Sequence, residues 1–126
     1  MSVKYDENGI PYPTCGVTED GILLASAART SDGQSAAVAC DWAHELLVMV
    51  DVTAVSGTSP TLDVDIEVSP DGGTTWFVAA SFTQWNNTTG KKLLALTTCG
   101  SLFRVAYQLG GTSPSFTFAA WYALKS

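Results

Sequence analysis

Four carboxylates near the middle of the chain are the residues best placed to do chemistry. Asp51 stands in VMVDVT, and Asp63, Asp65 and Glu67 alternate with apolar residues in LDVDIEV. That alternation places the last three on one face of a strand. Their oxygens could bind Ca²⁺, a basic side chain such as Arg104 or Lys91 could neutralise them, or they could form a solvated face. These three interpretations stay open, and we expect neither a metal nor another cofactor.

Nucleophilic catalysis finds little support in the sequence. Cys40 and His44 are four residues apart, a spacing that brings side chains together only on a helix, and this segment is predicted to be a turn that enters a strand. The GxSxG motif of Ser hydrolases is absent from the sequence. A pair of carboxylates for glycoside hydrolysis would need a cleft, whereas those in LDVDIEV lie on a flat strand. We therefore predict that the protein is not an enzyme.

The stretch SPDGGTTW carries the most specific motif. It matches S-x-D-x-G-x-[ST]-W and resembles the Asp-box of sialidases and related propellers, in which the Asp bonds the turn backbone, the Gly takes a special dihedral and the Trp packs beneath. The resemblance implies a structural turn built from Ser69, Asp71, Gly73, Thr75 and Trp76. A sialidase also needs three arginines for its substrate, and this chain has only Arg29 and Arg104. We expect a tight hairpin that joins strands at 61–69 and 75–82.

Composition limits the class of protein. With 126 residues, 46% of them hydrophobic and 14% charged, the chain can form a single folded domain. A net charge of -6 argues against nucleic acid as a partner, and no apolar run is long enough to cross a membrane. The first residues do not resemble a signal peptide, so the default expectation is synthesis in the cytoplasm. Three widely spaced cysteines then predict free, mostly buried thiols.

Short apolar runs between turn signals predict an all-β protein. Residues 1–20 contain several Gly and Pro and no period, so we expect an extended N-terminal arm followed by a β-sandwich domain at 21–126. Helical periodicity is nearly absent, and alternation in LDVDIEV and FRVAYQL is typical of antiparallel strands. We predict an antiparallel, jelly-roll or Greek-key sandwich of about eight strands, at 22–28, 34–40, 45–55, 61–69, 75–82, 90–97, 102–109 and 115–124.

The tetrapeptide GTSP occurs twice, at 57–60 and 111–114, each time between two apolar runs. Gly permits positive φ and Pro lacks a donor, so each copy is predicted to be a hairpin loop. The repeat indicates either two related halves of a sandwich or the chance reuse of a good loop.

The candidate contacts with partners are aromatic, apolar and basic residues. Trp85 is expected to be exposed because it stands in the polar stretch FTQWNNTTGKK. All acidic residues lie at or before Asp71, and four of the six basic residues follow it, an asymmetry that would suit docking if it survived folding. The predicted partner-binding residues are Tyr5, Ile10, Tyr12, Trp85, Lys91, Lys92 and Arg104.

A short acidic sandwich with an arm, GTSP-led turns and SPDGGTTW is similar to the capsid decoration, or cement, proteins of tailed bacteriophages, over about residues 45–124. The resemblance implies a structural virion protein that binds the outside of the capsid and stabilises it. Its partner would be the major capsid protein, its form a homotrimer, and its arm would reach across neighbouring subunits. The alternatives are a carbohydrate-binding or host-adhesion module, which an exposed row of Trp or Tyr beside polar residues would favour, and a phage neck or tail accessory protein.

Overall fold

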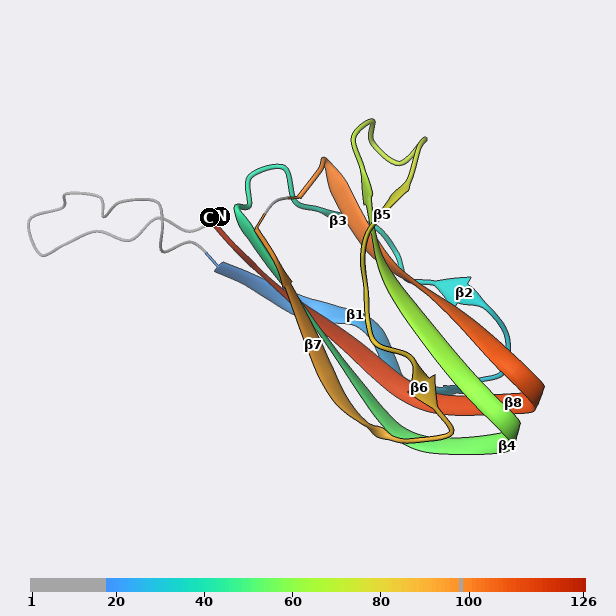
Figure 1. The fold of residues 1–126 in the computed structure, drawn as a ribbon. Helices are drawn as coiled ribbons and strands as arrows, with labels where there is room; N and C mark the ends of the chain where they lie inside the picture. Colours follow the sequence, from blue (N-terminus) through green and yellow to red (C-terminus); the bar gives the residue numbers. More distant parts are fainter. Residues whose placement is uncertain (1–17, 98) are drawn as a thin grey trace, which may run out of the picture.

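The computed structural model describes residues 18–97 and 99–126, and these form an all-β fold without a helix. No helix long and apolar enough to span a membrane occurs in these two ranges. Eight strands follow one another within these ranges (Figure 1): β1 (Thr18–Arg29), β2 (Gly33–Gln34), β3 (Val38–Ala39), β4 (Glu45–Ser69), β5 (Phe77–Ser81), β6 (Trp85–Asn86), β7 (Gly90–Leu96) and β8 (Leu102–Lys125).

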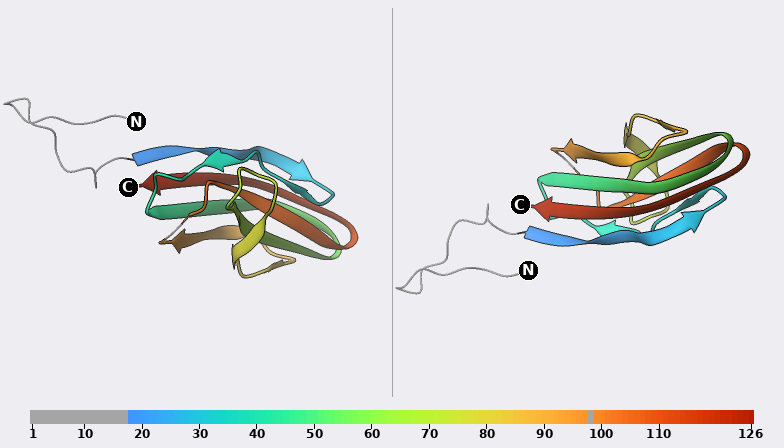
Figure 2. Two further views of the ribbon diagram at one scale, coloured as in Figure 1. Left: turned by 90° about the horizontal axis from the view of Figure 1, so that it is seen from above. Right: turned by 90° about the horizontal axis from the view of Figure 1, so that it is seen from below.

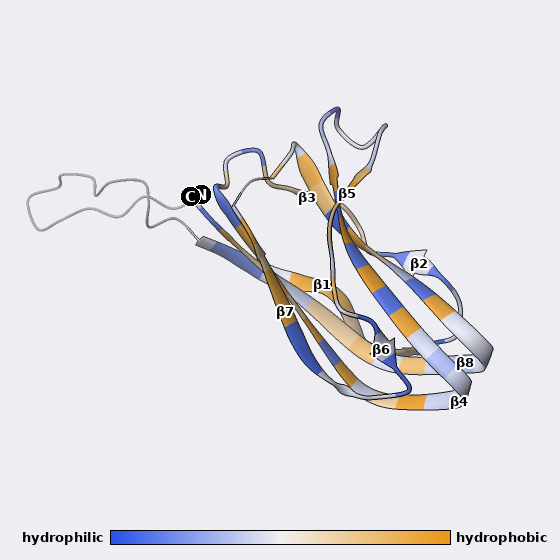
Figure 3. Ribbon diagram, in the orientation of Figure 1, coloured by the Kyte–Doolittle hydropathy of each residue, from blue (hydrophilic) through white to orange (hydrophobic). Residues whose placement is uncertain are grey.

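The two long strands, β4 and β8, form the centre of the fold. They pair antiparallel along their whole length, from Glu45 opposite Lys125 to Ser69 opposite Leu102. Polar and apolar residues alternate clearly along the second half of β4 (Figure 3), as expected for a strand with one face on the core. Each of these strands covers two of the runs that the sequence predicts as separate strands.

The two GTSP segments lie beside each other, with Thr58 opposite Thr112. Here β4 and β8 bend together and turn back at the same end of the molecule (Figures 1 and 2). The prediction of two hairpin loops is therefore wrong: 45–56 and 61–69 are not partners of each other but two parts of one strand that passes from one sheet to the other. The register shifts on both sides of Thr58 absorb the bend, as irregularities at sandwich corners do.

The repeat of GTSP has a direct explanation in this pairing. Gly57 and Gly111 have φ of 116° and 100°, values that side chains rarely adopt. A Cβ atom on Gly57 would lie 2.7 Å from the carbonyl oxygen of Ser113, and one on Gly111 would lie 2.5 Å from that of Ser59. The glycine of each corner thus lies against the serine carbonyl of the other corner. Both corners therefore require glycine at the first position of GTSP.

The bends divide the strands into two sheets, which are seen as two layers in Figure 2. The first sheet has the order β1, second half of β8, first half of β4, β7. The second has β2 and β3 on one edge, then the first half of β8, the second half of β4, and β5 and β6 on the other edge. Apart from the hairpin between β4 and β5, successive chain segments alternate between the sheets, which is the arrangement of a jelly roll, and the predicted fold class is confirmed. Because β1 begins at Thr18, residues 18–20 belong to the sandwich rather than to the arm.

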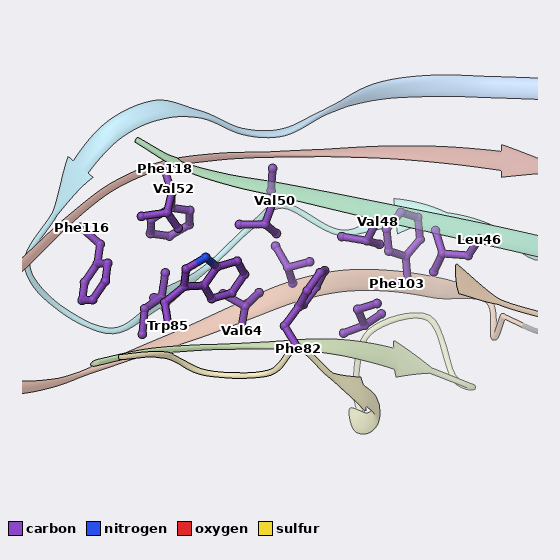
Figure 4. Packing of buried hydrophobic residues seen from close by; sticks show 14 of the residues in the cluster. Leu46, Val48, Val50, Val52, Val64, Phe82, Trp85, Phe103, Phe116 and Phe118 are labelled. Atoms are coloured by element: carbon purple, nitrogen blue, oxygen red, sulfur yellow. The ribbon is translucent and has the colours of Figure 1, made fainter. Parts of the chain in front are cut away.

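The core fills the space between the sheets (Figure 4). Its largest fully buried side chain is that of Trp85, which lies in β6 against Phe82, with ring centroids 5.8 Å apart. The expectation of an exposed Trp85 is wrong, because the polar residues around it occupy the outside of an edge strand while the indole turns inward. The other fully buried large side chains are Phe103, Phe116, Phe118, Leu46, Leu62, Ile66, Leu124, Val48, Val50, Val52 and Val64.

Candidate functional site

The outer face of the first sheet carries a row of apolar side chains that crosses all four strands. Ile22 of β1 lies opposite Trp121 of β8, Trp121 lies opposite Met49 of β4, and Met49 lies opposite Leu93 of β7. Ile22, Leu93 and Trp121 are 65%, 61% and 37% exposed, and Met49 is half-buried. We call these four residues the apolar row. Contiguous exposed apolar surface of this kind marks binding sites on soluble proteins.

The apolar row is hollowed on both sides of Trp121. One groove, of about 330 Å³, lies toward β7 and is lined by Met49, Leu93 and Trp121 together with their neighbours on β4 and β7. A second, of about 280 Å³, lies toward β1 and is lined by Ile22, Leu24 and Trp121 among others. The indole of Trp121 is thus a ridge between two grooves, and each groove is large enough for a side chain from another segment.

One ion pair borders the apolar row. Asp51 lies opposite Lys91 on the outer face, with 3.6 Å between its carboxylate Oδ2 and the Lys91 ammonium. Asp51 also lines both grooves. The Lys91 side chain is 84% exposed, so of the predicted basic contacts it is the one that lies mostly in solvent.

The outer face of the second sheet is different, because two of its carboxylates, those of Glu67 and Asp63, have partners within the chain. Arg104 lies opposite Glu67, and its Nε donates a hydrogen bond of 2.7 Å to Oε1 of Glu67. The guanidinium also lies over the Trp76 ring, 4.1 Å from the centroid. Gln84 donates to both carboxylate oxygens of Asp63.

These contacts support one of the three interpretations, a basic neighbour, for two of the four acidic residues. Asp51 and Glu67 are each neutralised by a basic side chain directly across the sheet, the second of the three. In the described ranges no three His, Cys, Asp or Glu side chains gather where they could hold a metal ion. The charge asymmetry of the sequence is largely cancelled at these two ion pairs, because β4 pairs with β7, which carries Lys91, and with β8, which carries Arg104.

Three of the predicted partner contacts make contacts within the fold. Trp85 is buried, and its Nε1 donates to the carbonyl of Gly90 at 3.2 Å. Lys92 covers that indole, with its ammonium 4.3 Å from the ring centroid, and donates to the carbonyls of Thr83 and Gln84. The Arg104 side chain is only 19% exposed. Tyr5, Ile10 and Tyr12 lie outside the described residues.

The SPDGGTTW turn has the structural role that its motif implies. Oδ1 of Asp71 accepts hydrogen bonds from Ser69 Oγ, at 2.9 Å, and from the backbone N–H of Thr75, at 2.8 Å. These bonds, that with Thr75 foremost, hold the pKa of Asp71 below its usual 3.8. Gly73 has φ of 103°, and its carbonyl accepts from Nε1 of Trp76. The turn joins β4 to β5 in a hairpin, with Val68 opposite Phe77, close to the expected boundaries.

Two cysteines form a disulfide that the sequence reasoning missed. Cys40, after β3, is bonded to Cys99, between β7 and β8, with an S–S distance of 2.06 Å. The prediction of free thiols is wrong for this pair. It rested on wide spacing, but the jelly roll brings residues 59 apart in sequence into contact. Disulfides persist mainly outside the reducing cytosol. His44 makes a structural contact: its backbone N–H donates to the carbonyl of Lys125 at 2.8 Å.

The apolar row was also missed by the sequence reasoning, although a signal was present. In ELLVMV the residues between the buried Leu46, Val48 and Val50 are themselves apolar. This stretch of β4 therefore lacks the polar, solvent-facing side that the second half of the strand has. A strand that is apolar on both faces indicates that its outer face is covered or used for binding.

No protein-family model matches the chain, and no curated protein matches it in sequence. Among solved structures, it is similar to a chain described as "Bacillus endospore appendages form a novel family of disulfide-linked pili". That likeness covers 87% of each chain, with 14% identity and a TM-score of 0.49. Values this low carry no argument about the function of this protein.

Proposed function

We propose that the protein is a structural subunit that assembles with other protein subunits through the outer face of its first sheet. The observation that carries this proposal is the apolar row, which crosses the sheet from Ile22 to Leu93 with both end residues more than half exposed. Burying a side chain of this size stabilises an interface by about 1.5–3 kcal/mol. A row of four can therefore supply the centre of a contact.

The edges of the two sheets favour contact through a face rather than through strand pairing. β7 carries Lys91 and Lys92, β1 has two register shifts, β5 has one, and β2 and β3 are two residues long each. Charges, irregularities and shortness are the devices by which proteins prevent edge pairing. Among the described strands, each edge has at least one of these protective features. The apolar row on the outer face has no comparable protection against contact with a partner.

A carbohydrate-binding module fits this face less well. Sugar rings stack on flat aromatic side chains with polar groups beside them. On the apolar row, Trp121 has aliphatic or thioether neighbours, and the adjacent Asp51 and Lys91 are paired with each other.

The resemblance and the disulfide support two candidates for the kind of assembly. A decoration protein on the exterior of a phage capsid, trimeric and bound to the major capsid protein, remains our first candidate. A polymer of the protein's own copies outside a cell is the second. The Cys40–Cys99 disulfide suits both, because virion surfaces and cell exteriors are oxidising.

The mass of the protein in solution, measured by light scattering over a range of concentrations, tests the proposal. We expect a trimer or a larger oligomer that falls to a monomer in Leu93→Lys, which places a charge in the apolar row. Gln108→Lys is the matched control, because Gln108 is exposed opposite Asp63 on the second sheet. An oligomer that resists Leu93→Lys, or that Gln108→Lys disrupts equally, would show that another surface makes the contact.

A further inference from the structure

The exposed large apolar side chains of the described residues gather in two places. Three of the five, Ile22, Leu93 and Trp121, lie in the apolar row. The other two, Phe77 and Val78, are 58% and 57% exposed and follow one another in β5, an edge strand of the second sheet. The apolar row lies on the outer face of the first sheet, and the core lies between the two sheets (Figure 2). A copy therefore cannot cover its own apolar row with its own β5.

The side chains of β5 match the spacing of the two grooves. Phe77 lies opposite Val68 and Val78 lies opposite Glu67, so the two apolar side chains point to opposite sides of β5. Stacked sheets lie about 10 Å apart, which means that each side chain extends about 5 Å from its strand and that the pair spans roughly 10 Å. The grooves on either side of Trp121 lie about one and a half to two strand spacings apart, or roughly 7–10 Å. A strand laid over the Trp121 ridge can therefore place one side chain in each groove.

The charges beside the two apolar surfaces are complementary. Lys91 lies on the outer face of β7, two positions from the apolar row, and its ammonium has three donors, so it can bind a second carboxylate besides that of Asp51. Asp65 lies on the outer face of β4, two positions from Glu67, the residue opposite Val78, and it has no ion-pair partner among the described residues. Each charge is thus about 7 Å from the apolar residue of its own surface. When the two surfaces meet, Lys91 of one copy can pair with Asp65 of the other.

We propose that the partner of the apolar row is a second copy of the chain, whose Phe77 and Val78 dock in the two grooves beside Trp121. This inference rests on the proposed function, because it names the surface that the assembly face meets. A contact between two different surfaces of identical subunits is heterologous, and it either closes into a ring, such as a trimer, or extends into a fibre. Both candidates for the assembly are therefore compatible with it. A two-fold contact of row against row would instead leave Phe77 and Val78 in water.

Mixing two variants of the full chain tests this contact, because each variant keeps one of the two surfaces. Leu93→Lys alters the apolar row and leaves β5 intact, whereas Phe77→Ser/Val78→Ser alters β5 and leaves the row intact. By light scattering over a range of concentrations, we expect each variant alone to be a monomer. Their equimolar mixture should reach the mass of two chains and stop there, because one intact row meets one intact β5. Gln108→Lys, on a central strand of the second sheet, is the matched control and should keep the wild-type mass.

The circular dichroism spectrum and the urea midpoint of each variant show whether its monomer is folded. If Phe77→Ser/Val78→Ser does not fold, Val78→Lys takes its place in the mixture, because a lysine at this exposed position would meet Lys91 of the other copy.

Four results would overturn the contact. If Phe77→Ser/Val78→Ser keeps the wild-type mass, or if the mixture of two monomeric variants stays monomeric, the apolar row meets another surface and the proposed function stands. If Leu93→Lys keeps the wild-type mass, the proposed function fails together with the contact. If the wild type is a monomer at every concentration, the apolar row does not meet a second copy, and only assembly with a different protein is left.

Discussion

The two halves of β4 face water on opposite sides of the sandwich, and they do so with different chemistry. In the first half the outward side chains include Leu47 and Met49, whereas in the second half they are Asp63, Asp65 and Glu67. Both halves bury regular apolar positions on the inside. The core therefore uses only one face of each sheet. The outer face can carry either polar side chains, which are stable in water, or apolar side chains, which are more stable when a partner covers them.

The second sheet also differs from the first in how it is held together. Its edge on the side of β2 and β3 has only four paired residues, while the first sheet has β1 and β7 with 12 and 7 residues. The Cys40–Cys99 disulfide lies at that short edge. We therefore expect the second sheet to depend on this covalent bond more than the first sheet does.

The largest expected effect comes from removing this tie. Cys40→Ala/Cys99→Ala should lower the free energy of unfolding by about 4 kcal/mol, the loop-entropy value for a bridge between residues 59 apart in sequence. Urea denaturation followed by circular dichroism measures it. Reductant should destabilise the wild type to a similar extent and leave the double variant unaffected. A loss below about 1 kcal/mol would mean that the second sheet holds without its disulfide.

The corners that join the two sheets come next. Gly111→Ala should cost about 3 kcal/mol, because the residue has φ of 100° and its new Cβ would meet the Ser59 carbonyl at 2.5 Å. Gly72→Ala is the matched control, with φ of 76° and no atom within 4 Å of its Cβ, and should cost only about 1 kcal/mol. Equal losses in urea titrations would show that the close contact between the corners contributes nothing.

The paired charges of the two outer faces should differ in strength. Glu67→Ala leaves Arg104, whose side chain is 19% exposed, without its carboxylate, and should cost about 2 kcal/mol of unfolding free energy. Asp51→Ala leaves Lys91, which is 84% exposed, and should cost less than about 0.5 kcal/mol. Thermal denaturation of both variants, side by side, checks the difference. Similar melting temperatures would contradict the distinction between the faces.

The smallest effect concerns the SPDGGTTW turn on the second sheet. The pKa of Asp71 is lowered in the folded protein by its hydrogen bonds to Thr75, Ser69 and Thr74. Its contribution to stability is therefore complete above the ordinary value near 3.8 and is lost as the pH falls through the lower folded pKa. Urea midpoints measured between about pH 5 and pH 2 should fall less steeply in Asp71→Asn than in the wild type. Parallel curves would assign the acid sensitivity to other carboxylates.

Local sequence pattern predicted much of this protein correctly. Alternation of polar and apolar residues indicated the strands, their antiparallel arrangement and the sandwich, because period two is a property of a strand by itself. The Asp-box motif predicted the turn at 69–76, because its hydrogen bonds join residues within four positions of one another. Both signals are short-range, and no distant segment can override them easily.

Only the tertiary structure decided the features that depend on which distant segments meet. GTSP became a pair of corners because β4 and β8 run side by side through it. Trp85 turned inward because the space between the sheets lay on its side of β6. Cys40 reached Cys99, and Ile22, Trp121, Met49 and Leu93 came into line, only through the pairing register of strands far apart in sequence. Register is set by the packing of the whole sandwich, and no local period records it.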